Sequence, residues 1–280
     1  MNLYTNDLSI GEVAQRTGVG VSTLRAWETR HGFPVARRLP SGHRRYTEQA
    51  VEAVLAVERE RRAGSTLDAA ITRARGRIGQ QLTSIFATVN NALPHVAPVV
   101  LSKRTMLAIS RAIEDEAATR AEHPLFVGAF QEPRFWRASA GRWAQLVGGQ
   151  DAAAVVLAAF RHSRQRSSVY EVAVPLGTPV LREWAVVCDS PAFSACLVGI
   201  EVLGARPTAD STRRFEALWT VEPLAVREAS RTGVVLAGGR YPEVADAIGS
   251  RLQQPVKATY DSIRVATVIT NRIVAYMESG

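Results

Sequence analysis

Two short helical segments joined by a glycine turn, close to the start of the chain, constrain the fold more than any other feature. Residues 9–17 begin with Ser9 and Glu12, a capping-box pattern in which each side chain bonds a free backbone N–H at a helix start. Gly18 favours a helix end, GVGV favours a tight turn, and we expect Ser22 to cap a second helix. Two short helices joined in this way form a helix-turn-helix.

The second helix is expected to have two different faces. At about 100° per residue, Val21, Leu24 and Trp27 fall on one side, so we expect Trp27 to pack inward. The opposite side offers hydroxyls, a guanidinium and a small side chain, which suit a DNA major groove where arginine pairs with guanine or phosphate. An ordinary solvated face is an equal alternative for this helix taken alone. The candidate DNA contacts are Ser22, Thr23, Arg25, Ala26 and Thr29.

A basic hairpin is predicted next, over residues 33–47. Two short arms flank Pro40-Ser41-Gly42, residue types that mark a tight turn. Positive charge at a hairpin tip is favourable where it meets phosphate. Thr47 is expected to cap a third helix, and a further helix is expected at about 66–76. The candidate contacts from the arms are Arg37, Arg38, His43, Arg44, Arg45 and Tyr46.

These pieces together resemble the winged-helix DNA-binding domain of the MerR family. The resemblance rests on SIGEVAQRTGVGVSTLRAWETRHGF and SGHRRY and covers about residues 8–76. It implies that Arg25 contacts DNA from the recognition helix. It also implies that Arg44, helped by Arg45 and Tyr46, contacts the DNA backbone from the wing.

The same resemblance has consequences for Glu28 and for assembly. Glu28 is expected to orient an arginine, with a simple pair to Arg25 as an equal alternative. Ala26 replaces a frequent tyrosine, so one DNA contact is missing. Members of the family bind near-palindromic operators as dimers, usually through a long helix, but residues 78–93 predict only a modest one. Their metal-responsive members carry cysteines there and this chain has none, so we expect no metal site.

From about residue 100 apolar, strand-like runs alternate with helical stretches, which predicts a mixed α/β domain. The runs are at 124–130, 152–160, 168–175, 183–190 and 195–203. Ser102 is expected to cap a helix over 101–121, and residues 260–279 are expected to form a closing helix, with a strand as the alternative, that joins a dimer interface.

Several phrases in this half resemble the DICT sensory domain. They are ISRAIEDE, FVGAFQEPRFW, REWAVVCDSP and RRFEALWTVEP, within about 100–222. The resemblance implies a sensory role, linked to light, redox or nucleotide signalling, and identifies no ligand. We therefore expect an α+β chain of two domains. An all-α winged helix-turn-helix domain bearing a β-hairpin is expected at 1–77, followed by a linker with a short helix at 78–100. An α/β sensory domain is expected at 101–222, with its helical extension at 223–280.

Candidate effector-binding residues are polar and aromatic groups near helix and strand ends: Glu114, Asp115, Phe130, Trp136, Trp143, Arg182, Trp184 and Trp219. For the tryptophans, core packing is the favoured alternative. For the carboxylates at 114–116, a solvated helix end is favoured. Arg182 and Glu183 suit either a buried ion pair or a ligand contact. Cys188 and Cys196 would form a redox switch if they met, but two small buried side chains are favoured.

Composition supports the same interpretation. The 280-residue chain has a formal net charge of +8 and a pI near 10.2, which favours an anionic partner such as nucleic acid. Two cysteines indicate a reducing cytosol, and no apolar run reaches the roughly 18 residues of a membrane span. No catalytic motif is present, and the sequence leaves any cofactor unknown.

We therefore expect a cytoplasmic, non-enzymatic, one-component transcription regulator. Its expected partners are double-stranded DNA, a second copy of the chain, a small-molecule effector and, at the promoter, RNA polymerase. The alternative is a constitutive architectural DNA-binding protein whose second domain serves dimerisation.

Overall fold

The computed structural model describes residues 8–38, 43–81, 84–149, 151–203, 209–253, 256 and 261–278. The chain separates into two compact units, Met1–Gln80 and Gln81–Gly280. The first is helical with a small hairpin, and the second contains an eight-stranded mixed sheet, so the α+β class predicted from the sequence is confirmed.

The first unit is built from local helix signals. Its elements are α1 (Ile10–Thr17), α2 (Val21–His31), β1 (Arg37–Arg38), β2 (Arg44–Arg45), α3 (Glu48–Arg62) and α4 (Leu67–Gln81). The capping box is confirmed: Ser9 Oγ accepts the Glu12 N–H at 3.3 Å, and Glu12 Oε2 accepts the Ser9 N–H at 2.7 Å. The predicted Ser22 cap is wrong, because α2 begins at Val21 after an extended Gly20 and no side chain caps it.

A compact core holds these helices together. Trp27 is buried, and its ring lies 6.3 Å from that of Phe33, between ring centroids. Thr47 accepts the N–H of Ala50 and caps α3, as predicted. Leu8 exchanges two backbone hydrogen bonds with Tyr46, an isolated bridge that ties the start of the described chain to the residue after β2. The helix-turn-helix and the wing therefore share one core.

The second unit has the strand order β3-β10-β9-β8-β4-β5-β7-β6, in which β4, β5 and β7 run parallel. The five predicted runs form β4 (Leu125–Gln131), β5 (Ala153–Ala158), β7 (Val169–Ala173), β8 (Glu183–Asp189) and β9 (Ser194–Glu201). The other strands are β3 (Val99–Ser102), β6 (Arg164–Arg166) and β10 (Arg214–Thr220).

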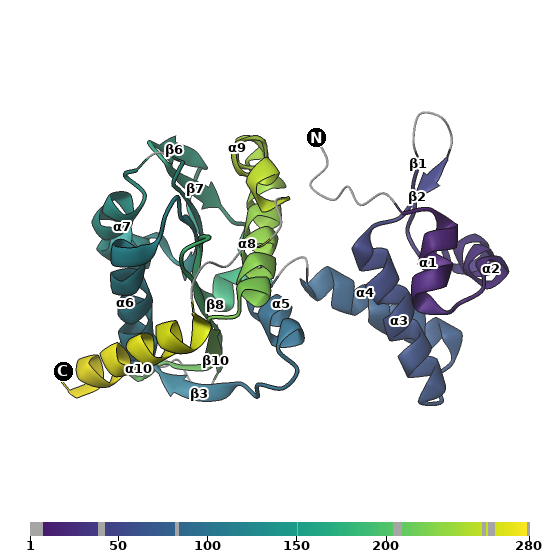
Figure 1. The fold of residues 1–280 in the computed structure, drawn as a ribbon, viewed down its shortest axis with the longest axis horizontal. Helices are drawn as coiled ribbons and strands as arrows, with labels where there is room; N and C mark the ends of the chain where they lie inside the picture. The colour runs from purple at the N-terminus through teal and green to yellow at the C-terminus, as the bar shows by residue number, and fades with distance from the viewer. Residues whose placement is uncertain are drawn as a thin grey trace. The chain divides into compact units, whose positions relative to one another are not determined.

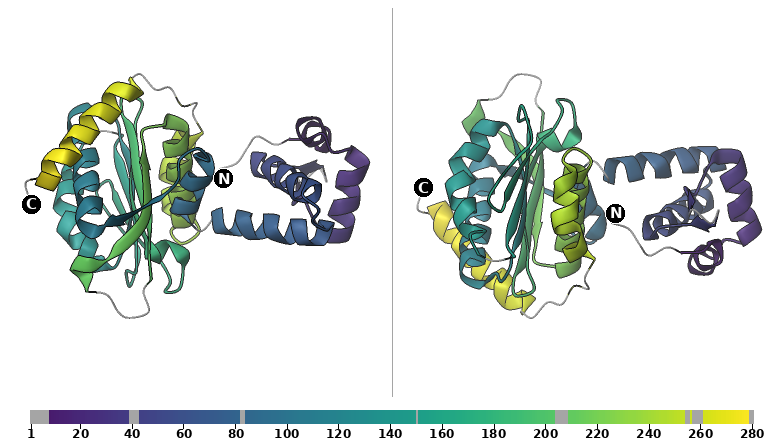
Figure 2. Two further views of the ribbon diagram at one scale, coloured as in Figure 1. Left: turned by 90° about the horizontal axis from the view of Figure 1, so that it is seen from below. Right: turned by 90° about the horizontal axis from the view of Figure 1, so that it is seen from above.

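Helices cover both faces of this sheet (Figures 1 and 2). One face is covered by α6 (Lys103–Arg120), capped by Ser102 as predicted, and by α7 (Pro133–Leu146), with α10 (Ser262–Glu278) against α6. The other is covered by α5 (Ile85–Ala92) and α8 (Pro223–Gly238), with α9 (Pro242–Leu252) against α8. The closing segment is thus a helix, as favoured, and no described helix is long and apolar enough to cross a membrane.

The region 78–100, expected to be a linker with a short helix, does contain a helix, but this helix belongs to the core of the second unit. Ile85 and Val89 of α5 are fully buried, and α5 packs against α8. The carboxylate of Glu183, itself fully buried, accepts the N–H groups of Ile85 at 2.9 Å and Phe86 at 3.2 Å. These partners are almost a hundred residues away in the sequence, so local patterns did not reveal that this helix is anchored.

Candidate functional site

The exposed face of α2 carries the residues that the helical spacing selected. Ser22, Arg25, Ala26 and Thr29 are exposed, Thr23 is half-buried, and Leu24 and Trp27 are buried. A cation–π contact places the guanidinium of Arg61 over the Trp27 ring, at 5.8 Å from its centroid. Trp27 therefore anchors the helix and leaves the polar face free to meet another molecule.

An ion pair connects α2 to the wing. Nε of Arg44 lies 2.7 Å from Oε1 of Glu28, and the Arg44 side chain is 47% exposed. Glu28 does orient an arginine, but this arginine comes from β2 and not from Arg25 on the same helix. The remaining donors of the guanidinium have no partner among the described residues and are available to a phosphate.

Tyr46 lies in the core and not on the surface where the resemblance placed it. Its side chain is only 1% exposed, and its hydroxyl donates to Glu28 Oε2 at 3.4 Å. Burial, followed by the neighbouring Glu28 carboxylate, raises the pKa of the Tyr46 hydroxyl, so it stays a donor. Tyr46 thus orients the carboxylate that holds Arg44.

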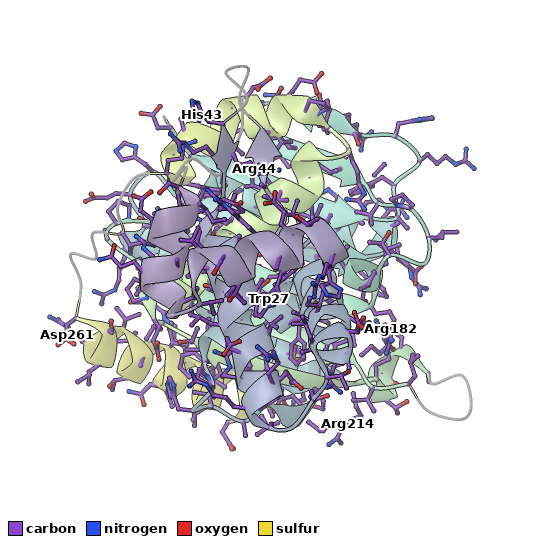
Figure 3. The ribbon with its side chains drawn as sticks, turned by 90° about the vertical axis from the view of Figure 1, so that its right-hand side faces the viewer. Trp27, His43, Arg44, Arg182, Arg214 and Asp261 are labelled. Carbon is purple, nitrogen blue, oxygen red and sulfur yellow. The ribbon has the colours of Figure 1, made fainter. Side chains whose placement is uncertain are left out.

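The rest of the wing is described in part. His43 is exposed, Arg45 is half-buried, and Figure 3 shows His43 and Arg44 on the wing. Arg37 and Arg38 pair by backbone with Arg45 and Arg44. Their side chains, and the turn at Pro40-Ser41-Gly42, lie outside the described residues.

The tryptophans expected near an effector belong to the core on the α6–α7 side of the sheet. Trp136, Trp143 and Phe130 meet edge to face, with ring centroids 5.1 to 5.6 Å apart. Each indole N–H has a partner: Trp136 donates to Glu171 at 2.9 Å and Trp143 to Glu114 at 2.8 Å. These contacts are what the core-packing alternative predicts.

The two outer tryptophans pack against the same core. Trp184 donates to Ser110 Oγ at 3.0 Å and meets Phe215 edge to face, and Trp219 is half-buried. Arg182 is exposed and donates to the backbone carbonyl of Glu201. Its neighbour Glu183 is buried against α5, so these two residues do not pair with each other.

The favoured interpretation of the carboxylates at 114–116 as a solvated helix end is wrong. Glu114 and Glu116 are only 5% and 2% exposed, because α7 and α10 cover this end of α6. Glu114 pairs with Arg142 at 2.7 Å, and Glu116 pairs with Arg272 at 2.9 Å. Burial raises the pKa of Glu114. Asp115, half-buried, contacts Arg142 and the hydroxyl of Tyr276.

The cysteines cannot meet, although they lie on one hairpin. In the register of β8 and β9, Cys188 pairs with Ala195 and Cys196 with Val187. The two thiols therefore point to opposite faces of the sheet. Both are buried and free, so the favoured alternative, two small buried side chains, describes them.

A cavity of about 750 Å³ lies elsewhere in the second unit, and none of the eight candidate effector residues lines it. Its walls come from the starts of β4, β5 and β7, the end of β8, and helices α8 and α9. Sequence reasoning missed it because its residues come from separate segments of the chain, and only Asp189, Ser190 and Pro191 belong to one of the phrases that carry the DICT resemblance. Within the described ranges, no cluster of three or more His, Cys, Asp or Glu could hold a metal ion.

Two family models match this chain. The MerR HTH family regulatory protein model matches residues 8–76, and the model of the sensory domain in diguanylate cyclases and two-component systems, DICT, matches residues 81–201. No curated protein matches it. Both resemblances seen in the sequence are thereby confirmed. The second match starts at residue 81, ahead of the expected start near 100, and so includes α5.

Proposed function

We propose a specific mode of action for this chain, which joins a MerR-family helix-turn-helix domain to a DICT sensory domain and is thus a DNA-binding regulator. It binds a near-palindromic operator as a homodimer. The exposed face of α2 enters the major groove, where Arg25 contacts a base edge, and Arg44 contacts the DNA backbone from the wing. An effector at the second unit changes the affinity for the operator.

The observation that carries the proposal is the Glu28–Arg44 ion pair. It joins the reading helix to the wing, with Tyr46 as the buried support. A cation fixed relative to a recognition helix can set the register of that helix on DNA, because phosphate contacts position while base contacts specify. An isolated basic helix would lack this positioning.

For an effector to control DNA binding, its binding must move an element of the sensory unit that is connected in the chain to the DNA-binding unit. Helix α5 directly follows α4 in the chain and is the first element of the second unit. Glu183 holds its first turn, and the hydroxyls of Thr88 and Thr232 join it to α8 at 3.0 Å. An effector that shifts α8 would therefore act on α5. A resulting change in DNA binding at a promoter would in turn affect RNA polymerase there.

Selection of binding sites from a random duplex library by the full chain tests the proposal. We expect enriched sequences with two half-sites related by inverted symmetry, and a dimer in sedimentation experiments with the selected duplex. Enrichment of a single half-site would contradict the homodimer. Binding without enrichment would favour the constitutive architectural alternative.

A further inference from the structure

We propose that the cavity between α9 and the strand ends binds a small organic oxyanion, a carboxylate or a phosphate ester, through Arg251. This proposal rests on the proposed function, since it names the effector's site and chemistry. Figure 1 shows α9 beside α8 at the end of the sheet where β7 lies. A volume of about 750 Å³ is that of a site for a small molecule.

One wall of the cavity is a fixed ion pair. Arg227 of α8 donates Nε to Asp189 Oδ2 at 2.6 Å and Nη2 to Oδ1 at 3.2 Å, and both side chains are almost fully buried. The carboxylate of Asp189 is therefore already engaged. This pair holds α8 to the end of β8 and leaves no strong acceptor on this wall.

Arg251, at the end of α9, is the second cation of the cavity. Within the part of the chain that the structure describes, it pairs with no carboxylate, and its hydrogen bond runs from Nη1 to the backbone carbonyl of Asp151 at 2.5 Å. Asp151 is exposed at the rim. No described residue accepts a hydrogen bond from Nε or Nη2 of Arg251, so these two donors suit a two-point contact with an oxyanion.

The surroundings make this cation costly without a counter-ion. Burial lowers the pKa of Arg251; the Asp189 carboxylate opposes that shift, and the nearby Arg227 adds to it. A guanidinium nevertheless keeps its charge in proteins. An anion beside Arg251 would relieve both the lost hydration and the repulsion from Arg227.

Tyr170 supplies a further donor. Its side chain is 8% exposed, and its hydroxyl makes no hydrogen bond with any described residue. Burial, followed by the effect of Tyr241, raises the pKa of Tyr170, so the hydroxyl keeps its proton. Arg251 and Tyr170 thus both offer the cavity donors that no described residue engages, and these suit a ligand with acceptor oxygens.

The ligand also needs an apolar part. Leu125, Ala152, Ile248, Leu252 and Val256 line the same cavity. Arg227 and Arg251 lie beyond the range 81–201 matched by the DICT model, so this chemistry comes from helices outside that match. Arg227 stands on α8, which carries Thr232 and its contact to α5, so an anion in the cavity would lie next to the helix through which we expect control.

Titration calorimetry of the full chain without DNA tests the cavity, with phenyl phosphate, benzoate and uncharged benzyl alcohol as probes. We expect a Kd of about 1 mM or tighter for at least one anion, and binding of benzyl alcohol at least about tenfold weaker. The tighter anion identifies the head group as phosphate or carboxylate. If neither anion binds at about 10 mM, or benzyl alcohol binds equally well, the proposal is wrong.

Two variants locate the binding. Arg251→Gln should weaken the tighter anion by about tenfold or more, and Tyr170→Phe, which keeps the ring, should weaken it by a smaller factor. Arg137→Gln is the matched control: Arg137 is exposed on α7, on the opposite face of the sheet, and the change should leave the Kd unaltered. Equal effects of Arg251→Gln and Arg137→Gln would show non-specific attraction and overturn the site.

The operator affinity is then measured with and without the tighter anion. An altered affinity supports both proposals. Anion binding with unaltered operator affinity contradicts the effector part of the proposed function and leaves the cavity site intact. Intact operator binding by a chain that binds neither anion contradicts the cavity site alone.

Discussion

The first unit keeps Arg25 and Arg44 at the surface, whereas in the second unit Arg227 is almost fully buried and Arg251 is half-buried beside a cavity. Arg44 is about half exposed, and its carboxylate partner orients it without removing it from water. Arg227 is 11% exposed beside an Asp189 that is 4% exposed, so this pair has lost its hydration and depends on its geometry. Surface arginines can exchange counter-ions for phosphates, while a buried, paired arginine such as Arg227 fixes the local structure.

The largest effect that tests this comparison is expected from removing one partner of the buried Arg227–Asp189 pair. Asp189→Ala should lower the free energy of unfolding by about 3–5 kcal/mol, because it removes the carboxylate that pairs with the buried charge of Arg227. Urea unfolding followed by tryptophan fluorescence reports on the second unit, which holds four of the five tryptophans: Trp136, Trp143, Trp184 and Trp219.

The matched control for that measurement is Glu132→Ala. Glu132 pairs with Arg134 in the same unit, and both side chains are more than half exposed, so the loss should be below about 1 kcal/mol. Equal losses for the two variants would show that enclosure adds nothing to the Asp189 pair.

On the exposed side, Arg25→Ala should reduce the preference for the operator over random DNA by about 1–3 kcal/mol, since a base-edge contact is lost. Fluorescence anisotropy with both duplexes measures the ratio of affinities. Arg62→Ala, at the end of α3, removes the same charge away from the reading face and should preserve that ratio. A constant ratio for Arg25→Ala would mean that this arginine only positions the helix.

A smaller and more uniform effect is expected from Arg44→Ala. All sequences should bind more weakly by a similar factor, and the slope of log affinity against log salt should fall in magnitude by about 1. Glu28→Gln keeps the Arg44 charge but weakens its attachment to α2, so it should preserve the slope better than Arg44→Ala does. An unchanged slope in Arg44→Ala is incompatible with the wing contact.

Mild oxidation is not expected to join Cys188 and Cys196 in a disulfide. Burial raises the pKa of Cys188 well above its usual range and that of Cys196 to about 12, and the thiols face opposite sides of the sheet. Mild oxidation of the folded chain should leave two titratable thiols after denaturation. Recovery of an internal disulfide would contradict the strand register.

Features that depend on residues close together in the sequence were predictable, whereas features that depend on distant residues were not. Ser9, Glu12, Gly18 and Thr47 act within a few residues, and the faces of α2 follow from its spacing, so these features were predictable. The sequence wrongly predicted Ser22 as the cap of α2, because Gly20 takes the capping position and no side chain bonds the free N–H groups there.

In the second unit the strands were predictable from their apolar runs, but their surroundings were not. The burial of Glu116 depends on Arg272 and α10, which follow some 150 residues later in the chain. The cavity unites strand ends with α8 and α9, and no local pattern marks residues such as Tyr170 or Arg251 as neighbours. Contacts between residues so far apart in the chain leave no periodic pattern in the sequence.

Glu183 also decides where the sensory module can be cut. Burial raises the pKa of this carboxylate, and the N–H groups of Ile85 and Phe86 are among its hydrogen-bond donors. A fragment that began near residue 100 would lack α5, so the buried Glu183 carboxylate would lose these two hydrogen-bond donors. A designer who transplants the sensor onto another DNA reader should therefore make the fusion ahead of Ser84, so that α5 travels with the sheet.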